Sequence, residues 1–256
     1  MSTRKSKATA DREKLVLSSP FTWPPESVLN SKGNHRWSRK VVFDLHEVIV
    51  EWGNQFAEFI NRTHPGVNMQ FDAQRFYNAA FDPDSNLTPE LFDEAFATFA
   101  RLSVGGYGDL KPIAGIVDTI KKIQAAGIKV EIWTWTPGAA ELQPQHLNAY
   151  NTGIAQRVTR DLVRKLGLPI DAERDLRFMS PSSKIREMVE DHVPLIVEDN
   201  PATAVQVFNY GHAAILVPTT YNDITCRNVL RLSDRSELAD AVIDFFKKLD
   251  EAGVLL

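Results

Sequence analysis

The sequence predicts an α/β fold built on a doubly wound parallel sheet, and three observations support this. A short apolar run of strand length begins at residue 40, and further runs alternate with segments of helical periodicity from about residue 109 onward. Three of these runs, in "KVVFDLHEV", "GIKVEIWTWTP" and "VPLIVEDNP", end in a polar or acidic side chain. Helical patterns separate the runs from one another. Strands that alternate with helices in this way are typical of a parallel sheet covered on both faces.

Length and composition indicate an enzyme-sized unit with a substantial core. The chain has 256 residues, 43% of them apolar, which allows one large domain or a domain with an insertion. A formal charge of −4 gives no electrostatic reason to expect binding to nucleic acid or to an anionic membrane. The single Cys226 rules out an internal disulfide, and the first residues lack the apolar stretch of a secretion signal. We therefore expect a cytoplasmic protein with no membrane contact, whose oligomeric state the sequence does not determine.

The segment after the first strand predicts a second, helical layer. "VIVEWGNQFAEFINRTH" places apolar side chains at helical spacing. A second helix follows a clear start signal, in which Thr88 is the cap and Pro89 the first residue of "PELFDEAFATFARL". The Gly-rich "SVGGYGDL" then returns the chain to the sheet. Residues 47–108 are thus predicted to form a helical insertion.

The remaining chain divides into a core and an N-terminal extension. Helices are predicted in "KPIAGIVDTIKKIQAAG", "GIAQRVTRDLVRKLG", "SSKIREMVEDH", "PATAVQVFNYG" and "SELADAVIDFFKKLD", and further strands in "LRFMS" and "AAILV". The predicted organisation is a disordered basic tail over residues 1–16, an irregular arm over 17–39, an α/β core over 40–46 and 109–256, and the helical insertion over 47–108.

Chemically active side chains follow the predicted strands. Asp44 ends the first run, Thr134 ends the second, and the pair Glu198 and Asp199 ends the third. Lys184 precedes the third run in "SPSSKIREM". Open α/β sheets bind their ligands at the carboxyl ends of the strands, so these side chains are expected to meet there. Taken singly, each signal is weak, since an Asp that closes a strand is most often a loop starter or a helix cap. The competing role of Thr134 is an ordinary strand-end residue, and that of Lys184 is a solvated helix residue, with Arg186 as a possible substitute.

In this order, the four motifs resemble those of the haloacid dehalogenase superfamily over about residues 40–250. The resemblance implies a Rossmann-type core with a helical cap after the first motif, and Mg²⁺-dependent hydrolysis of a phosphomonoester through an aspartyl-phosphate. Asp44 would be the nucleophile, Thr134 a hydroxyl donor to the phosphoryl group, and Lys184 the cation that balances its charge. The implied metal ligands are the Asp44 carboxylate, the backbone carbonyl of His46, and Asp199, with Glu198 beside them.

Within the superfamily, the sequence is most similar to 5′-nucleotidases and 5′(3′)-deoxyribonucleotidases. The similarity rests on the small helical cap, the "GIKVEIWT" entry to the second motif, the acidic pair in "IVEDN" and the late "TTYN…VLRLSD" segment. It implies a small phosphorylated substrate, such as a nucleotide. Candidate substrate contacts are Trp52, Phe56 and Trp135, with Phe76, Tyr77 and Phe81 as further aromatic residues of the insertion. Packing inside the insertion is the competing role for these rings.

His46 departs from the family pattern, whose phosphatases usually carry a second Asp at this position. A histidine can act as a general acid or base near neutral pH, so the site is chemically competent. The alternatives are a weakened site, or a structural residue in a silent module that binds a phosphorylated ligand. A phosphatase for protein or nucleic-acid ends is a further alternative, and the insertion argues against it by narrowing access.

Overall fold

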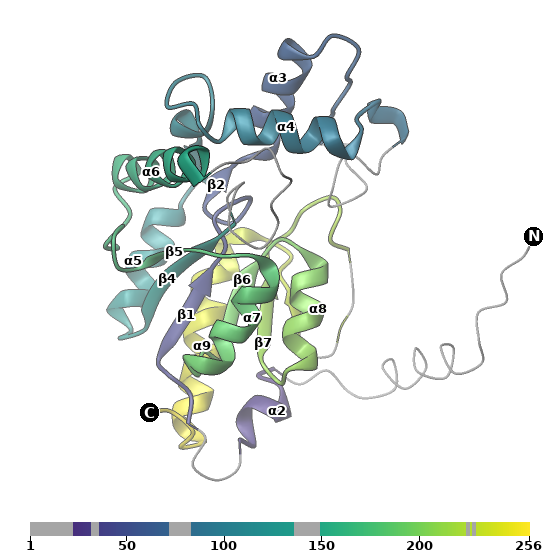
Figure 1. The fold of residues 1–256 in the computed structure, drawn as a ribbon. Helices are drawn as coiled ribbons and strands as arrows, with labels where there is room; N and C mark the ends of the chain where they lie inside the picture. The colour runs from purple at the N-terminus through teal and green to yellow at the C-terminus, as the bar shows by residue number, and fades with distance from the viewer. Residues whose placement is uncertain (1–22, 32–35, 72–82, 136–148, 224–225, 227–228) are drawn as a thin grey trace, which may run out of the picture.

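A single parallel sheet forms the centre of the molecule. The computed structural model describes residues 23–31, 36–71, 83–135, 149–223, 226 and 229–256. Its six strands run in the order β5-β4-β1-β6-β7-β8, and every neighbouring pair is parallel (Figure 1). The strands are β1 (Lys40–Phe43), β4 (Lys129–Thr134), β5 (Leu176–Phe178), β6 (Leu195–Glu198), β7 (Ala213–Leu216) and β8 (Val229–Arg231). This arrangement confirms the predicted fold class.

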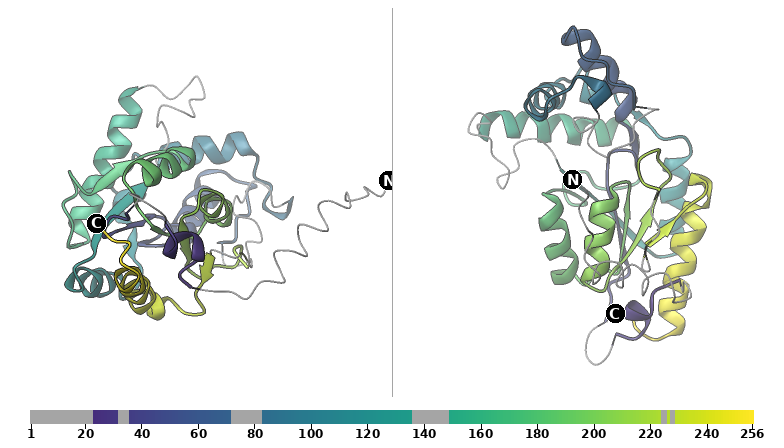
Figure 2. Two further views of the ribbon diagram at one scale, coloured as in Figure 1. Left: turned by 90° about the horizontal axis from the view of Figure 1, so that it is seen from below. Right: turned by 90° about the vertical axis from the view of Figure 1, so that its right-hand side faces the viewer.

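Helices cover both faces of the sheet, as Figure 2 shows in its right-hand view. Side chains alternate between the two faces along β1, because successive residues of a strand point in opposite directions. Val41 and Phe43 join the core beneath α5 (Ile116–Ala125) and α9 (Leu238–Glu251). Val42 joins the opposite core, beneath α7 (Pro181–Glu190) and α8 (Pro201–Asn209). Burial on both faces explains why the strands read as continuous apolar runs. The remaining long helix of this region is α6 (Ala149–Lys165).

The sixth strand, β8, is not among the strands that the sequence predicts. It extends over only three residues, and only one of them, Val229, is fully buried. So short a segment carries no periodicity that separates a strand from a loop. Pairing with β7 is what makes it a strand.

Between β1 and α5 the chain forms the helical insertion, which lies above the sheet in Figure 1. Its elements are β2 (Val50–Glu51), α3 (Gly53–Thr63), the 3-10 turn η3 (Pro83–Ser85), α4 (Pro89–Phe99), the 3-10 turn η4 (Tyr107–Asp109) and β3 (Lys111–Pro112). The start of α4 is as predicted, since the Leu91 amide donates to the Thr88 hydroxyl at 3.3 Å and Pro89 is the first helical residue.

The first helix of the insertion begins later than its apolar pattern predicts. Val50 belongs to β2, which pairs with β3 in an antiparallel ribbon, and Trp52 is the residue before α3. The prediction of a helix from residue 48 is therefore wrong at its start. Apolar residues of a two-residue strand followed by a helix imitate a helical period, and only the distant pairing partner distinguishes the two.

The N-terminal arm is described in part. Residues 1–22 lie outside the described residues, and so do Phe76, Tyr77 and Phe81 of the insertion. Within the arm, α2 (Glu26–Leu29) precedes Trp37, whose indole donates to the Val28 carbonyl at 3.0 Å. Trp37 also bridges to Leu255 at the other end of the chain. Among the described residues, no helix is both long and apolar enough to cross a membrane.

Candidate active site

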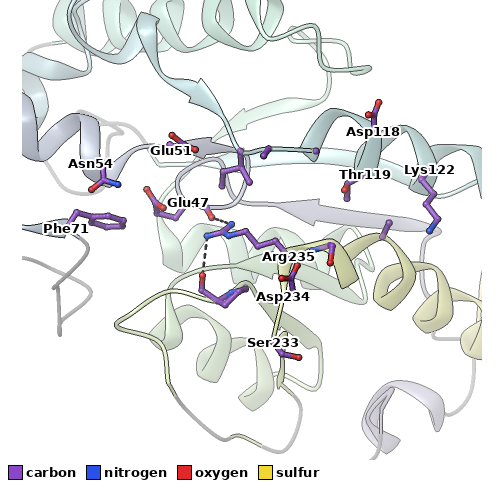
Figure 3. Close-up of a pocket in the computed structure, with 16 residues that line it drawn as sticks. Glu47, Glu51, Asn54, Phe71, Asp118, Thr119, Lys122, Ser233, Asp234 and Arg235 are labelled. Carbon is purple, nitrogen blue, oxygen red and sulfur yellow. Dashed lines mark hydrogen bonds between the residues drawn. The ribbon is translucent and has the colours of Figure 1, made fainter.

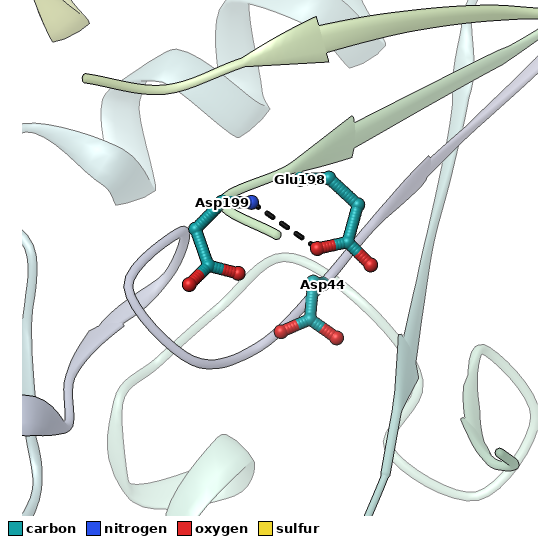
Figure 4. A group of neighbouring side chains, drawn as sticks. All are labelled: Asp44, Glu198 and Asp199. Atoms are coloured by element: carbon teal, nitrogen blue, oxygen red, sulfur yellow. Dashed lines mark hydrogen bonds between the residues drawn. The ribbon is translucent and has the colours of Figure 1, made fainter. Parts of the chain in front are cut away.

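Four charged side chains meet at the carboxyl end of the sheet. Asp44 follows β1, Glu198 and Asp199 come from the end of β6, and Lys184 comes from α7. All four are buried. The Lys184 ammonium contacts the Asp44 carboxylate and lies 2.9 Å from Glu198 Oε1. Oxygens of the three carboxylates lie within 4.8 Å of one another, and Figure 4 shows the carboxylates gathered together.

Burial and mutual repulsion set the charges in this cluster. Burial, then the charges of Glu198 and Asp44, raise the pKa of Asp199 well above its ordinary value. Burial also raises the pKa of Glu198, although the ammonium of Lys184 opposes this. Burial alone would lower the pKa of Lys184, but the charges of Asp44 and Glu198 outweigh it and the pKa is raised. One lysine thus stabilises two of three neighbouring carboxylates.

The acidic pair, Glu198 and Asp199, is held by hydrogen-bond partners that the sequence motif does not predict. Glu198 Oε2 accepts the amides of Asp199 at 3.1 Å and Asn200 at 3.2 Å. The Tyr221 hydroxyl donates to Asp199 Oδ2 at 2.5 Å, and the Asn222 amide donates to the Asp199 carbonyl at 3.0 Å. The only sequence signal for these two partners is their place in the "TTYN" segment.

The His46 ring contacts Tyr107, a residue that the sequence analysis does not predict to be part of the site. Its Nε2 lies in short contact with the Tyr107 hydroxyl, and the two rings meet edge to face with centroids 5.4 Å apart. Burial, followed by the charge of Lys184, lowers the pKa of His46 to about 3, so its ring is neutral at physiological pH. Among the described residues, His46 Nδ1 makes no hydrogen bond. The signal for Tyr107 is its position in "GGYGD", where glycines allow a tight turn.

Thr134 lies deeper than its predicted role requires. It ends β4 as predicted, but its side chain is fully buried and is not part of the cavity wall. The hydroxyl donates to the Trp135 carbonyl at 3.3 Å and also bonds the Tyr107 hydroxyl. Thr134 is therefore not exposed to the cavity in this structure, and its role as a hydroxyl donor to the phosphoryl group stays a prediction.

The loop between Asp44 and β2 is fastened from both sides. Glu47 adopts a left-handed backbone conformation, with φ of 54°, and its carboxylate accepts the amides of Trp52 at 2.8 Å and Gly53 at 2.7 Å. These are free donors at the start of α3, so the carboxylate stabilises the helix terminus. From the opposite side, Arg235 donates to the carbonyl of Pro218 and to that of Glu47, beside which Figure 3 shows it. Arg235 borders a separate, wider hollow behind the loop.

A cavity of about 240 Å³ opens above the charged cluster. Of the predicted site residues, the wall brings together Asp44, His46, Trp52, Trp135, Lys184, Glu198 and Asp199. Phe56, a predicted substrate contact, is fully buried and is not part of the wall. Its ring stacks on Trp52 instead, with centroids 4.7 Å apart. Phe56 therefore supports the wall from behind and does not face the cavity.

The donor set suits a hard divalent cation. Mg²⁺ prefers oxygen ligands, commonly one or two carboxylates together with phosphate and water. Asp44 and Asp199 are close enough to share an ion, and Glu198 lies beside them. Among the described residues, Lys184 is the one ammonium in contact with these carboxylates, so a divalent cation would offset the remaining negative charge.

Comparisons with known proteins give similarity only at the level of solved structures. No protein-family model matches the chain, and no curated protein matches it. A haloacid dehalogenase-like hydrolase from Xanthomonas campestris is 15% identical, with a TM-score of 0.49, over 91% of this chain and 99% of that one. A HAD family hydrolase from Deinococcus radiodurans, with bound phosphate and sodium, is 15% identical, with a TM-score of 0.46, over 85% and 97%. CbbY from Rhodobacter sphaeroides, in complex with phosphate, is 17% identical, with a TM-score of 0.47, over 81% and 100%.

Proposed function

We propose that this protein is a Mg²⁺-dependent phosphomonoesterase that acts on a nucleotide or another small phosphorylated metabolite. The observation that carries the proposal is the buried contact of Lys184 with Asp44 and Glu198, beside Asp199, at the carboxyl end of the sheet. A buried carboxylate held by an ammonium is an oriented nucleophile. The cavity directly above it is small, which favours a small substrate over a protein or nucleic-acid end.

In the proposed reaction, a carboxylate oxygen of Asp44 attacks phosphorus. The bond from phosphorus to the ester oxygen breaks, and the leaving oxygen takes up a proton from solvent water, because the His46 ring is neutral at physiological pH. Water then attacks the aspartyl-phosphate, the phosphorus–Asp44 bond breaks, and the carboxylate is restored with release of phosphate. When bound, Mg²⁺ would supply positive charge for the phosphoryl oxygens. Asp44, Asp199 and the His46 carbonyl would hold it, with Glu198 alongside.

His46 is the proposed proton carrier, acting through Nδ1. Nε2 is occupied by Tyr107, and the neutral ring is able to accept a proton from the attacking water. Lys184 keeps Asp44 oriented and offsets charge on the transferred group. Thr134 is proposed to act indirectly, by supporting Tyr107 and Trp135. Residues 47–108 are proposed to serve as the cap over the substrate.

The test is phosphate release from nucleotides, sugar phosphates and phosphopeptides, with and without Mg²⁺. Wild-type protein is expected to release phosphate only with the metal. Asp44→Asn keeps the shape of the side chain but removes the nucleophilic charge, so it should lose at least about a thousandfold in kcat. Activity that persists in this variant, or in excess chelator, would contradict the covalent mechanism.

A silent module that binds a phosphorylated ligand is the second candidate. The contact between His46 and Tyr107 favours it, because it occupies a ring nitrogen that an acid–base catalyst would use. This candidate predicts that a phosphorylated ligand binds with Mg²⁺ but that no ester on the panel is hydrolysed. Calorimetry on the same panel separates the two functions.

A further inference from the structure

Protein donors already bind most of the carboxylate oxygens in the charged cluster. The Lys184 ammonium contacts Asp44 Oδ1, and the His46 amide donates to Asp44 Oδ2 at 3.0 Å. Lys184 also donates to Glu198 Oε1, and the Asp199 amide donates to Glu198 Oε2. Among the described residues, no donor reaches Asp199 Oδ1, whereas every other oxygen of the three carboxylates accepts a hydrogen bond. A metal ion would therefore meet one open carboxylate oxygen and share the others with the protein.

Tyr221 holds the second oxygen of Asp199. Its hydroxyl donates to Asp199 Oδ2 at 2.5 Å, and the residue lines the cavity. Hydrogen bonds to an ionised carboxylate are short and stronger than those between neutral groups, so this contact restrains the rotation of the carboxylate. Phe71 packs edge to face on the Tyr221 ring, with centroids 6.0 Å apart, and supports it from the side.

The loop that carries Tyr221 is anchored through Asn222, which is fully buried. The Asn222 amide nitrogen donates to the Asp199 carbonyl at 3.0 Å. Its side-chain oxygen accepts the Thr219 amide at 3.2 Å and the Arg231 guanidinium at 3.3 Å. Buried polar groups that are satisfied in this way define one conformation of a loop. The Tyr221 hydroxyl is thus held in place relative to the backbone of the residue that it contacts.

This restraint affects Mg²⁺ and Ca²⁺ differently. Ca²⁺ takes about six to eight oxygen ligands in a flexible geometry, and one carboxylate often supplies two of them. Mg²⁺ is smaller, requires a nearly ideal octahedron and keeps several waters, so one oxygen from each carboxylate is enough. A carboxylate that rotates freely can serve either ion. A carboxylate restrained through its second oxygen favours Mg²⁺.

We propose that Tyr221 is a specificity-determining residue of the metal site, which favours Mg²⁺ over Ca²⁺ by holding Asp199 as a one-oxygen ligand. The inference rests on the metal site of the proposed function, and it adds the residue that selects the metal. It requires no contact between Tyr221 and the substrate.

The experiment measures metal binding by the full chain without substrate. Mn²⁺, which also accepts octahedral oxygen ligands, is bound first, and the electron paramagnetic resonance signal of the released ion reports its displacement by Mg²⁺ or by Ca²⁺. The quantity compared among variants is the Kd for Ca²⁺ divided by the Kd for Mg²⁺. Asp199→Asn locates the binding, because an ion at the cluster should bind much more weakly to this variant.

Tyr221→Phe keeps the ring and removes the hydroxyl. Asp199 Oδ2 can then join Oδ1 on a Ca²⁺ ion, so the ratio should fall by about tenfold, as the loss of one hydrogen bond to a charged group allows. A purely structural role for Tyr221 would weaken the binding of both ions alike and leave the ratio unchanged. Tyr210→Phe is the matched control, because Tyr210 lies at the end of α8, is 64% exposed and does not line the cavity.

A crystal structure of Tyr221→Phe with Ca²⁺ provides a second measurement. Both oxygens of Asp199 should lie at about 2.3 to 2.6 Å from the ion in this variant, and one oxygen in the wild-type protein. A Ca²⁺ ion bound by one Asp199 oxygen in both proteins would overturn the inference.

The remaining outcomes separate the inference from the function beneath it. An unchanged ratio in Tyr221→Phe overturns the inference and leaves the phosphatase function standing, because phosphate release is measured independently. Binding that is unaffected by Asp199→Asn also overturns it, since the ion then lies elsewhere. If the wild-type protein hydrolyses no ester but Tyr221→Phe still lowers the ratio, the phosphatase function fails and the inference holds.

Discussion

The Asp199 carboxylate is electrostatically unfavourable in the folded protein. It is buried within reach of two others, and burial and repulsion raise its pKa well above the ordinary value. The hydroxyl of Tyr221 compensates only in part. Groups that are strained by like charge in the folded state are common at functional sites, because a ligand relieves the strain.

Asp199→Asn should therefore raise the stability of the metal-free protein while it weakens metal binding. The amide keeps an oxygen for Tyr221 but removes the repulsion with Glu198 and Asp44. We expect the free energy of unfolding to rise by about 1 kcal/mol. Thermal unfolding with and without Mg²⁺ measures both effects, and the rise in Tm that Mg²⁺ produces should shrink in the variant. A metal-free variant less stable than wild type would contradict the repulsion argument.

His46→Asp tests the departure from the motif that the sequence resembles. The shorter carboxylate is the side chain that phosphatases with this motif usually carry, so turnover in the proposed reaction should increase if His46 limits the rate. The same change leaves the buried Tyr107 hydroxyl without its histidine partner, so some stability should be lost. Single-turnover kinetics separate formation of the aspartyl-phosphate from its hydrolysis. Equal inactivity of both proteins, with intact folding and Mg²⁺ binding, would favour the silent module.

At the scale of elements, the turn η4 determines the position of Tyr107, its first residue. Gly106 precedes it, and a Cβ at that position would lie 2.5 Å from Leu102 Cβ and 2.7 Å from the Phe99 carbonyl oxygen. Lys165 from α6 fastens the same turn by donating to the Gly108 carbonyl at 3.0 Å. Gly106 is thus needed because the backbone lies close to the end of α4, whereas Gly105 has room for a Cβ but adopts a positive φ of 69°.

Gly106→Ala should destabilise the protein by about 1 to 3 kcal/mol and shift Tyr107 away from His46. The matched control is Gly153→Ala in α6, where a Cβ meets no atom within 4 Å. Alanine there should stabilise the helix by about 0.5 to 1 kcal/mol. Denaturant unfolding of the two variants gives opposite signs if the turn is as tightly packed as described. Destabilisation of both by similar amounts would contradict this.

At the scale of the whole molecule, a second buried carboxylate connects the strands of the sheet away from the site. Glu131 on β4 lies 2.7 Å from the Lys129 ammonium and 3.0 Å from that of Lys40 on β1, and it accepts from the Trp133 indole at 2.9 Å. Burial alone would raise the pKa of Glu131, but these partners outweigh it and the pKa is lowered. The network therefore stabilises the folded state when Glu131 is ionised.

This network predicts how the free energy of unfolding changes at acidic pH. Since the folded pKa of Glu131 lies below its unfolded value of 4.5, the unfolded state binds more protons in this range. The stabilisation is complete above about pH 4.5 and is lost as the pH falls through the folded pKa. Glu131→Gln should cost about 2 kcal/mol at pH 7, and this difference from wild type should shrink below pH 4.5. Urea unfolding at several pH values measures it.

The control for this prediction is a surface pair. Glu190 and Arg186 are 3.9 Å apart and largely exposed, so Glu190→Gln should change stability by less than about 0.5 kcal/mol at any pH. If Glu131→Gln and Glu190→Gln have equal effects, the buried network does not stabilise the protein as argued.

The sequence by itself determined the features that depend on local pattern. Apolar runs flanked by helical periods specify the parallel sheet, because a strand buried on both faces must be apolar throughout. The polar residues that end these runs, Asp44, Glu198 and Asp199, meet because parallel strands share one carboxyl edge. The start of α4 is also predictable from the sequence, since Thr88 and Pro89 act on adjacent backbone atoms.

Only the tertiary structure decided which side chains meet across long separations. Tyr107 reaches His46 from 61 residues away, and no periodicity encodes that contact. Thr134 is fully buried although it ends a strand at the site, and Phe56 stacks on Trp52 and does not line the cavity. Because β2 pairs with β3, Val50 and Glu51 form a strand, and α3 begins later than the sequence predicts. Local patterns fix which face of an element is apolar, whereas the neighbour that covers that face depends on how distant segments pack.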